Sequence, residues 1–500
     1  MLLSSLRSFR RAFALLLASI LVASVATSSG RAQQPITVGQ TFLAAAIDPA
    51  KGPAGWALVS HGVGQTLFAV DRAGRVAPLL AEKAEAIDAR TWTVHLKPGL
   101  RFSDGSPVDA ASVAAALTRT VRDNPAARGS AQLAFQALDA GTLRVEADRP
   151  VPILPSVLAE WPFVVYRETP QGMVFTGPWQ IAAFEPDRGM RLVANPHFLG
   201  AAGRPAIRLQ RFGDAQSLAL AAQSGEVDLA FNVPVEALPR LRATPGLTVK
   251  SFAVAYQYMA WMNTARPFLG DVRVRRALDL AIDRHQLAAT LGGGEPATGA
   301  YARQYPFAST IERPFDRAAA RALLDEAGWR LDGGKRQKDG QTLKLTVLAY
   351  PQRPDLVSLQ PVLRDQLMRL GIEVETRVVE NAQAAAREGS FDLLLWAQHT
   401  APAGDPAFFL NVFLRSGAAN NHSRFASPVL DRVLDRFTTA SSAADRAAIA
   451  AEAERIVLAD APVAYLLTPV WHVALSRRLA GYEPWGSDYY VLRPDLEVAH

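Results

Sequence analysis

The chain of 500 residues contains no cysteine. This absence excludes disulfide bridges, thiolate zinc sites and cysteine nucleophiles together. It also leaves no cysteine to carry a lipid at a processed N-terminus. We therefore expect a protein without a lipid anchor.

Motifs of common enzyme classes are also absent. The chain has no G-x-S-x-G elbow, no H-E-x-x-H pair, no EF-hand loop and no G-x-G-x-x-G after a predicted strand. The glycine-rich loops at residues 292–296 and 333–336 lack the spacing of a P-loop. The eight histidines are scattered. We expect no catalytic residue, no metal and no cofactor, and we keep a secreted α/β hydrolase, with a Ser-His-Asp cluster assembled from distant residues, as an alternative.

A large net charge is absent from most of the chain. The formal net charge is +6, but residues 1–32 hold four arginines and no acidic residue, which leaves +2 for the rest. The remaining charges are interspersed and form no basic stripe that could follow phosphates. We expect no nucleic-acid partner.

The first 32 residues have the composition of a secretory signal peptide. Arginines precede an apolar run at residues 12–25, and the small residues Gly30 and Ala32 suit a signal peptidase. The run is short for a membrane span, so we predict a cleaved signal at residues 1–32 and a periplasmic protein. A single-helix anchor is the alternative. The adjacent arginines leave both general and twin-arginine export open.

The most informative stretch is residues 91–117, TWTVHLKPGLRFSDGSPVDAASVAAAL. Residues 91–96 alternate polar and apolar side chains, which predicts a half-buried strand. Residues 103–107 favour a tight turn, and the apolar spacing after them predicts a helix that begins near Asp109 or Ala110. This strand, turn and helix resembles the signature of the family 5 solute-binding proteins of bacterial ABC importers, the peptide- and nickel-binding class.

Further segments resemble the same family in the same chain order. They are residues 64–81, 175–179, 195–200, 215–230, 271–284 and 316–329. The resemblance covers nearly all of the chain after the signal. It implies an α/β fold, the two-lobed periplasmic binding protein of type II, with hinged lobes around a central cleft. It places lobe I at residues 33–262 plus 482–500 and lobe II at residues 263–481.

The second half of the chain alternates strand and helix patterns. Residues 343–349 and 372–379 predict strands on either side of a helix at residues 356–370, which indicates a mostly parallel sheet. Residues 391–396 are apolar throughout and predict a strand buried on both faces. In the first half, the helix that starts at residue 215 is predicted to end at Gly225.

The resemblance implies a protein that binds a solute between its lobes and delivers it to the permease and ATPase complex of an ABC importer at the inner membrane. We expect a monomer that captures a short peptide or a peptide-like solute. A nickel chelate, a metallophore or an opine is the alternative ligand within the binding class. In either case the ligand would favour closure of the lobes through tighter contacts with the closed form.

The loop after the buried strand, residues 396–406, is expected to contact the ligand. Peptide-binding relatives carry an acidic residue three positions before an Asp-Pro or Glu-Pro pair, where it holds the peptide amine, but this position is Pro402 here. Nickel-binding relatives have a run that residues 399–402 resemble, which places His399 near their aromatic residue. His422 is a loose match to a histidine that they use further along. The two alternatives separate on whether both histidines point into one cavity.

The candidate ligand-binding residues follow from these matches. Trp396 could stack on a ligand or fill the core. Arg415 could pair with a ligand carboxylate or with a surface acid. His422 could bind a ligand, but the pattern around it is common across the whole family and favours a plain loop residue. The full candidate set is Tyr256, Tyr258, Trp396, His399, Thr400, Arg415, Asn421 and His422.

Overall fold

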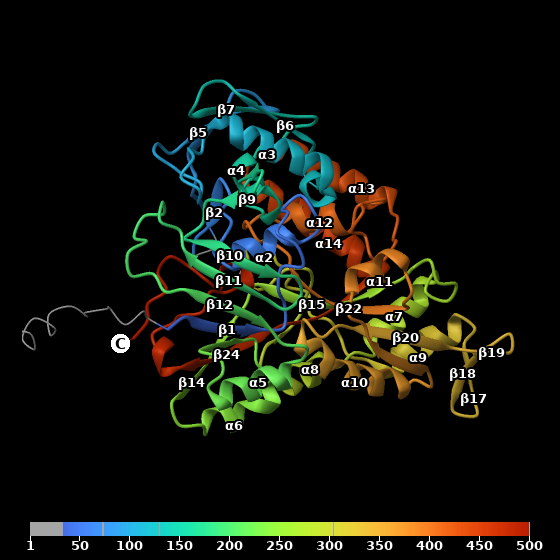
Figure 1. The fold of residues 1–500 in the computed structure, drawn as a ribbon. Coiled ribbons are helices and arrows are strands. Elements are labelled where there is room, and N and C mark those ends of the chain that lie inside the picture. The colour runs from blue at the N-terminus through green and yellow to red at the C-terminus, as the bar shows by residue number, and fades with distance from the viewer. Residues whose placement is uncertain (1–33, 73–74, 130, 304, 500) are drawn as a thin grey trace, which may run out of the picture. The chain divides into compact units, whose positions relative to one another are not determined.

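Two large β-sheets and a smaller four-stranded sheet organise the fold (Figure 1). The structure is a computed structural model that describes residues 34–72, 75–129, 131–303 and 305–499. The elements lie in one unit, Ile36–His500. The signal peptide expected at residues 1–32 lies outside the described residues.

The first large sheet has seven strands in the order β10-β11-β12-β1-β13-β24-β14. Strand β1 is parallel to both of its neighbours, and the other pairings are antiparallel. Helix α5 (Ala215–Ser224) packs against the sheet and ends at Gly225, whose positive φ of 77° closes the helix as predicted. The strands are β1 (Ile36–Gln40), β10 (Trp179–Glu185), β11 (Gly189–Ala194), β12 (Ile207–Arg211), β13 (Leu229–Phe231), β14 (Leu247–Ala253) and β24 (Val470–Ser476).

The four-stranded sheet contains the predicted signature stretch and has its own hydrophobic core. Strand β5 (Thr91–Leu96) and helix α3 (Ala110–Asp123) confirm the predicted strand and helix. The Asp109 side chain accepts a hydrogen bond from the Ser112 N–H at 2.8 Å, which caps the helix. The remaining strands are β4 (Ala81–Ala86), β6 (Leu133–Ala137) and β7 (Thr142–Ala147).

The second large sheet has six strands in the order β16-β23-β15-β22-β20-β21. Strand β20 is parallel to β21 and β22, which confirms the predicted strand-helix-strand unit, but the other pairings are antiparallel. The expectation of a mostly parallel sheet is therefore wrong. Two neighbouring strands can run parallel only if a crossover segment connects them. In this sheet, helices supply such a crossover only within the predicted strand-helix-strand unit. The elements are β15 (Tyr256–Met262), β16 (Glu295–Pro296), β20 (Lys344–Ala349), α10 (Pro354–Met368), β21 (Glu373–Val378), β22 (Leu393–His399) and β23 (Val463–Thr468).

For two strands, the sheet that they join in the structure differs from the sheet expected from the predicted lobe boundaries. Those boundaries assign residues 256–262 to lobe I and residues 470–476 to lobe II. Strand β15 instead pairs with β22 and β23, and β24 pairs with β13 and β14. The physical reason is backbone pairing, because β24 supplies the hydrogen-bond partners that the adjoining edges of β13 and β14 need.

The other elements connect and cover these sheets (Figure 1). The short strands are β2 (Phe68–Val70), β3 (Val76–Pro78), β8 (Tyr166–Thr169), β9 (Gly172–Phe175), β17 (Arg330–Asp332), β18 (Lys335–Lys338) and β19 (Gln341–Thr342). The helices are α2 (Ala54–Ser60), α4 (Leu154–Val157), α6 (Leu238–Arg242), α7 (Val272–Leu280), α8 (Arg284–Thr290), α9 (Arg317–Glu326), α11 (Ala382–Glu388), α12 (Ala407–Phe413), α13 (Pro428–Asp435) and α14 (Ala443–Asp460). The 3-10 helices are η1 (Pro125–Arg128), η2 (Trp161–Phe163), η3 (Val235–Ala237), η4 (Arg436–Thr438), η5 (Arg477–Leu479) and η6 (Asp488–Tyr490).

Gly177 lies where the backbone leaves no room for a side chain. A Cβ added there would collide with the Gly62 carbonyl oxygen and would lie 2.5 Å from the Val63 carbonyl oxygen. Because backbone atoms cannot move aside cheaply, we expect Gly177→Ala to lower the free energy of unfolding by about 1–3 kcal/mol. Denaturant unfolding measures the change. Gly213→Ala is the matched control, since no atom lies within 4 Å of that Cβ, and an equal loss in both variants would contradict the prediction.

Candidate functional site

A buried ion pair joins two segments that lie far apart in the sequence. Arg353 precedes helix α10, and Asp488 lies in η6 near the C-terminus. The Arg353 Nη2 atom donates to the Asp488 carboxylate at 2.5 Å, and Asp488 is 0% exposed. Tyr256 and Trp56 donate hydrogen bonds to the other carboxylate oxygen, the latter at 3.3 Å. A fully buried carboxylate is thus matched by one cation and two neutral donors.

Four aromatic rings enclose the guanidinium of Arg353. Its Cζ atom lies 5.4 Å from the ring centroid of Phe42, 5.5 Å from those of Trp56 and Tyr256, and 5.3 Å from that of Trp471. Burial opposes the charge of Arg353, but the Asp488 charge and the neighbouring tyrosines together outweigh burial and raise the arginine pKa. The rings favour the cation further. We call Phe42, Trp56, Tyr256, Arg353, Trp471 and Asp488 the Arg353 cluster.

Tyr258 extends the cluster but has its hydroxyl already engaged. The hydroxyl donates to Asp355 Oδ2 at 2.5 Å and accepts from Trp471 Nε1 at 2.6 Å. Burial raises the pKa of Asp355 to about 6. Tyr258 thus positions Trp471, one of the rings that enclose Arg353.

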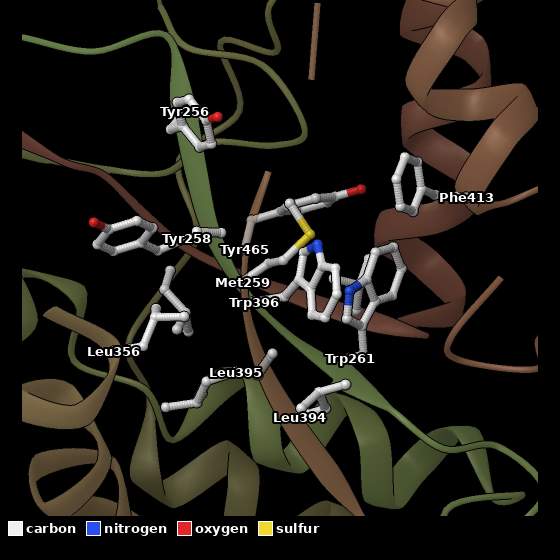
Figure 2. Close-up of a cluster of buried hydrophobic side chains, with 14 of the residues drawn as sticks. Tyr256, Tyr258, Met259, Trp261, Leu356, Leu394, Leu395, Trp396, Phe413 and Tyr465 are labelled. Atoms are coloured by element: carbon white, nitrogen blue, oxygen red, sulfur yellow. The ribbon is translucent and has the colours of Figure 1, made fainter. Parts of the chain in front are cut away.

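The two candidate histidines lie on opposite faces of the six-stranded sheet. His399 stacks on Tyr256 with ring centroids 5.4 Å apart, whereas His422 packs on Trp396 at 4.7 Å. Side chains alternate along a strand, so the register that pairs Tyr256 with His399 sends Trp396 to the other face. Figure 2 shows Tyr256 and Tyr258 on one side and Trp396 with Trp261 on the other. The two histidines therefore do not share a cavity.

Both histidines are neutral at physiological pH. Burial lowers the pKa of His399 to about 3, and it lowers the pKa of His422 to about 3 as well. His422 is enclosed by the rings of Trp261, Trp396 and Phe413. It therefore lies in an aromatic core, together with Trp396.

The remaining candidates lie away from the Arg353 cluster or are already engaged. Arg415 donates to Asp435 at 2.8 Å and to Asn411. Asn421 bonds the carbonyl oxygens of Arg415 and Phe425 and so shapes its own turn. Thr400 is fully buried, and within the described residues its hydroxyl has no hydrogen-bond partner.

The acid of the Asp-Pro pair is also engaged. Asp405 receives two hydrogen bonds from Arg446, at 2.5 and 2.7 Å, and both residues are buried. Asp405 is thereby committed to a bidentate ion pair. It cannot substitute for the acid that Pro402 replaces.

Sequence patterns missed most of the Arg353 cluster. Only Tyr256 was among the expected residues, because Phe42, Trp56, Arg353 and Asp488 stand in segments without a recognisable motif. The one local signal was Asp488, an acid that directly precedes two tyrosines in the C-terminal segment. If such an acid is buried, its charge needs hydroxyl and cation partners.

Two absences hold for the part of the chain that the structure describes. No group of three or more His, Cys, Asp or Glu side chains there could hold a metal ion. None of its helices is long and apolar enough to cross a membrane.

Comparison with known proteins gives consistent matches. Residues 75–421 match the family described as bacterial extracellular solute-binding proteins, family 5 Middle. Protein XP55 of Streptomyces lividans is 31% identical over 437 residues, which cover 81% of this chain and 78% of that protein. The crystal structure of NikA from Staphylococcus aureus in complex with Ni(L-His)2 superposes with a TM-score of 0.85 at 20% identity, covering 93% of this chain and 99% of that one. The murein tripeptide binding protein MppA of Escherichia coli gives 0.81 at 22%, covering 93% and 98%.

These matches confirm the expected fold class, the two-lobed α/β periplasmic binding protein of type II. Members of the family are extracellular or periplasmic binding proteins, not enzymes, and work with the permease and ATPase of ABC importers. Since the family match extends over more than half of the sequence, the chain belongs to the bacterial extracellular solute-binding proteins of family 5.

Proposed function

We propose that this chain captures a short peptide or a peptide-like solute in the periplasm and delivers it to an ABC importer. The observation that supports this ligand is the Arg353 cluster. A guanidinium binds a carboxylate with two parallel hydrogen bonds, and aromatic faces cover apolar parts of a solute. Among the described residues, the side-chain hydrogen bonds of Arg353 reach only Asp488 and the Gln352 carbonyl oxygen. Most of its five N–H donors therefore remain for a solute.

In this proposal the lobes follow the two large sheets, with crossings at residues 254–255 and at Pro469. Phe42 and Trp471 then come from the lobe of the seven-stranded sheet, and Arg353 and Tyr256 come from the other lobe. A solute bound at the Arg353 cluster touches both lobes. It therefore favours the closed form of a hinged pair.

The proposal includes a monomer without lipid anchor, exported by a cleaved signal at residues 1–32 and without catalytic activity. N-terminal sequencing and light scattering of the protein purified from the periplasm test processing and monomeric state. A bound peptide should be recovered intact after prolonged incubation. Its cleavage would favour the hydrolase alternative.

A nickel chelate is the second candidate ligand. The structure of NikA from Staphylococcus aureus, which was solved with Ni(L-His)2, supports this alternative at the level of fold. His399 is the candidate metal ligand, because it is neutral and its buried Nδ1 atom has no partner among the described residues. His422 lies on the other face of the sheet, so two-histidine capture is not part of this alternative.

A thermal-shift screen of the periplasmic protein decides between the ligands. We expect di- to pentapeptides to raise the melting temperature, because a ligand at 100 times its dissociation constant stabilises the folded state by about 2.7 kcal/mol. Opines, nickel alone and nickel with histidine are the other probes. A shift in melting temperature only with nickel and histidine would indicate that the ligand is a nickel chelate and not a peptide. His399→Ala should then abolish that shift. No shift with any peptide would contradict the proposal.

A further inference from the structure

The loop at residues 41–53 connects β1 to α2 and leads into the Arg353 cluster. This loop and the first turn of α2 supply Phe42 and Trp56, two of the four rings that enclose the guanidinium. The two rings also contact each other, with centroids 4.8 Å apart. Loops are the more mobile parts of a fold. A fixed position for these rings therefore needs an anchor outside the Arg353 cluster.

An ion pair with helix α3 supplies such an anchor. The Arg119 guanidinium donates to both oxygens of the Asp48 carboxylate, at 2.7 Å each. The Asp48 side chain is 12% exposed and that of Arg119 is 20% exposed, so the pair is largely shielded from water. Arg119 also donates to the Tyr166 hydroxyl at 2.9 Å, and this hydroxyl donates to the Ala116 carbonyl oxygen at 3.3 Å. Tyr166 thus helps to orient the guanidinium that holds the loop.

Electrostatics keep this pair charged. The hydrogen bonds from Arg119 are the largest cause that lowers the pKa of Asp48, against the opposite effect of burial. Asp123 and Glu168 lie 3.7 and 3.5 Å from the same guanidinium and add negative charge around it. Two parallel bonds from an arginine also fix the orientation of a carboxylate, which the single ammonium group of a lysine does not. The pair therefore fixes the direction of the loop as well as its distance from α3.

Asn124 adds a second anchor from the residue that follows α3. Its Nδ2 atom donates to the Pro49 carbonyl oxygen at 3.3 Å and to the Gly52 carbonyl oxygen at 3.0 Å. Its Oδ1 atom accepts from the Ala126 N–H at 3.1 Å and so caps η1. Asn124 is 2% exposed, so these bonds are protected from competition by water. The C-terminal part of α3 thus holds the loop through two neighbouring groups.

These contacts connect α3 with the rings around Arg353. We propose that Arg119 is a positioning residue for solute binding, which acts through Asp48 to hold the rings of Phe42 and Trp56 in place before the solute arrives. Binding then costs less free energy, because the rings do not have to be ordered at that moment. This inference rests on the proposed function and gives the helix of the signature stretch a role in binding without contact to the solute.

Calorimetric titration with the peptide that gives the largest thermal shift tests the role of Arg119. We expect Arg119→Met to bind this peptide about 10-fold more weakly than wild type, because both rings must then be ordered on binding. Arg119→Lys should lie between them, since lysine restores the charge without the two parallel bonds. Arg122→Met is the matched control on the same helix, because Arg122 is exposed and pairs with its neighbour Asp123. Wild-type affinity in a folded Arg119→Met variant would overturn the inference.

A cycle of combined variants distinguishes positioning from a general loss of structure. In a protein that carries Phe42→Leu and Trp56→Leu the two rings are missing, so adding Arg119→Met should weaken binding by less than about 2-fold. This lack of additivity is the signature of a residue that acts through the rings. If Arg119→Met weakened binding by the same factor with and without the rings, it would act by another route and the inference would be overturned.

Asn124→Ser keeps the inference testable if Arg119→Met does not fold. Serine still caps η1, but it lacks the amide that bonds Pro49 and Gly52, and no buried charge loses its partner. We expect this variant to bind the peptide about 3-fold more weakly, and wild-type affinity would overturn the inference. Failure of every peptide to bind wild-type protein would overturn the proposed function as well, whereas the other contradicting outcomes overturn the positioning role alone.

Discussion

Replacing Arg353 by methionine is expected to weaken peptide binding about 100-fold and to destabilise the fold. Removing one partner of a buried charge pair typically costs about 2–5 kcal/mol of binding when a ligand is involved. The fold loses about 3–5 kcal/mol of unfolding free energy, because Asp488 is left as an uncompensated buried charge. Calorimetric titration measures the first change and denaturant unfolding the second.

A double variant separates binding from stability. Arg353→Met combined with Asp488→Asn removes both charges, so it should recover much of the stability while peptide binding stays weak. Arg369→Met is the matched control, since Arg369 is exposed, directly follows α10 and pairs with Asp365 of that helix. Wild-type affinity in a folded Arg353→Met variant would exclude Arg353 as the carboxylate partner.

Glu454 is expected to make the protein less stable as the pH rises from about 4.5 to about 7. Burial raises its pKa to about 7, although the N–H groups of Ala300 and Ser309 oppose this shift. Between the unfolded value of 4.5 and the folded value, the folded state holds a proton that the unfolded state has released. Stability therefore falls with pH in this interval, by about 3 kcal/mol in total at 1.36 kcal/mol per pH unit.

The variant Glu454→Gln isolates this effect. It cannot ionise and keeps an oxygen for the Ala300 N–H, which bonds Glu454 Oε1 at 2.6 Å. The stability difference between variant and wild type should grow by about 3 kcal/mol from pH 4.5 to pH 8, as measured by denaturant unfolding at each pH. Asp355 has the same sign and contributes equally to both proteins. A constant difference across this range would contradict the prediction, and Glu452→Gln on the same helix serves as the control.

Local signals in the sequence determined the parts of the fold that depend on near neighbours. The alternation at residues 91–96, the cap at Asp109 and the stop at Gly225 each act within a few residues, so they could be recognised without tertiary contacts. The turn between β5 and α3 is of the same kind. Together with the matching order of further segments, these signals were sufficient to identify the family and its α/β fold.

Most of the candidate site was decided by contacts between distant segments. The Arg353 cluster joins residues from Phe42 to Asp488, and no local spacing connects them. Strand register, which depends on pairing, placed His399 and His422 on opposite faces. Burial, which depends on the whole fold, lowered the pKa of both histidines to about 3.

The same division holds for the lobes. Strand and helix periodicities, which are local properties of the chain, indicated an α/β protein, and the resemblance to family 5 implied its two lobes. Only the tertiary structure decided that β15 joins the six-stranded sheet and β24 the seven-stranded sheet. The physical reason is that a strand is assigned by the partner that satisfies its backbone hydrogen bonds, and that partner lies far away in sequence.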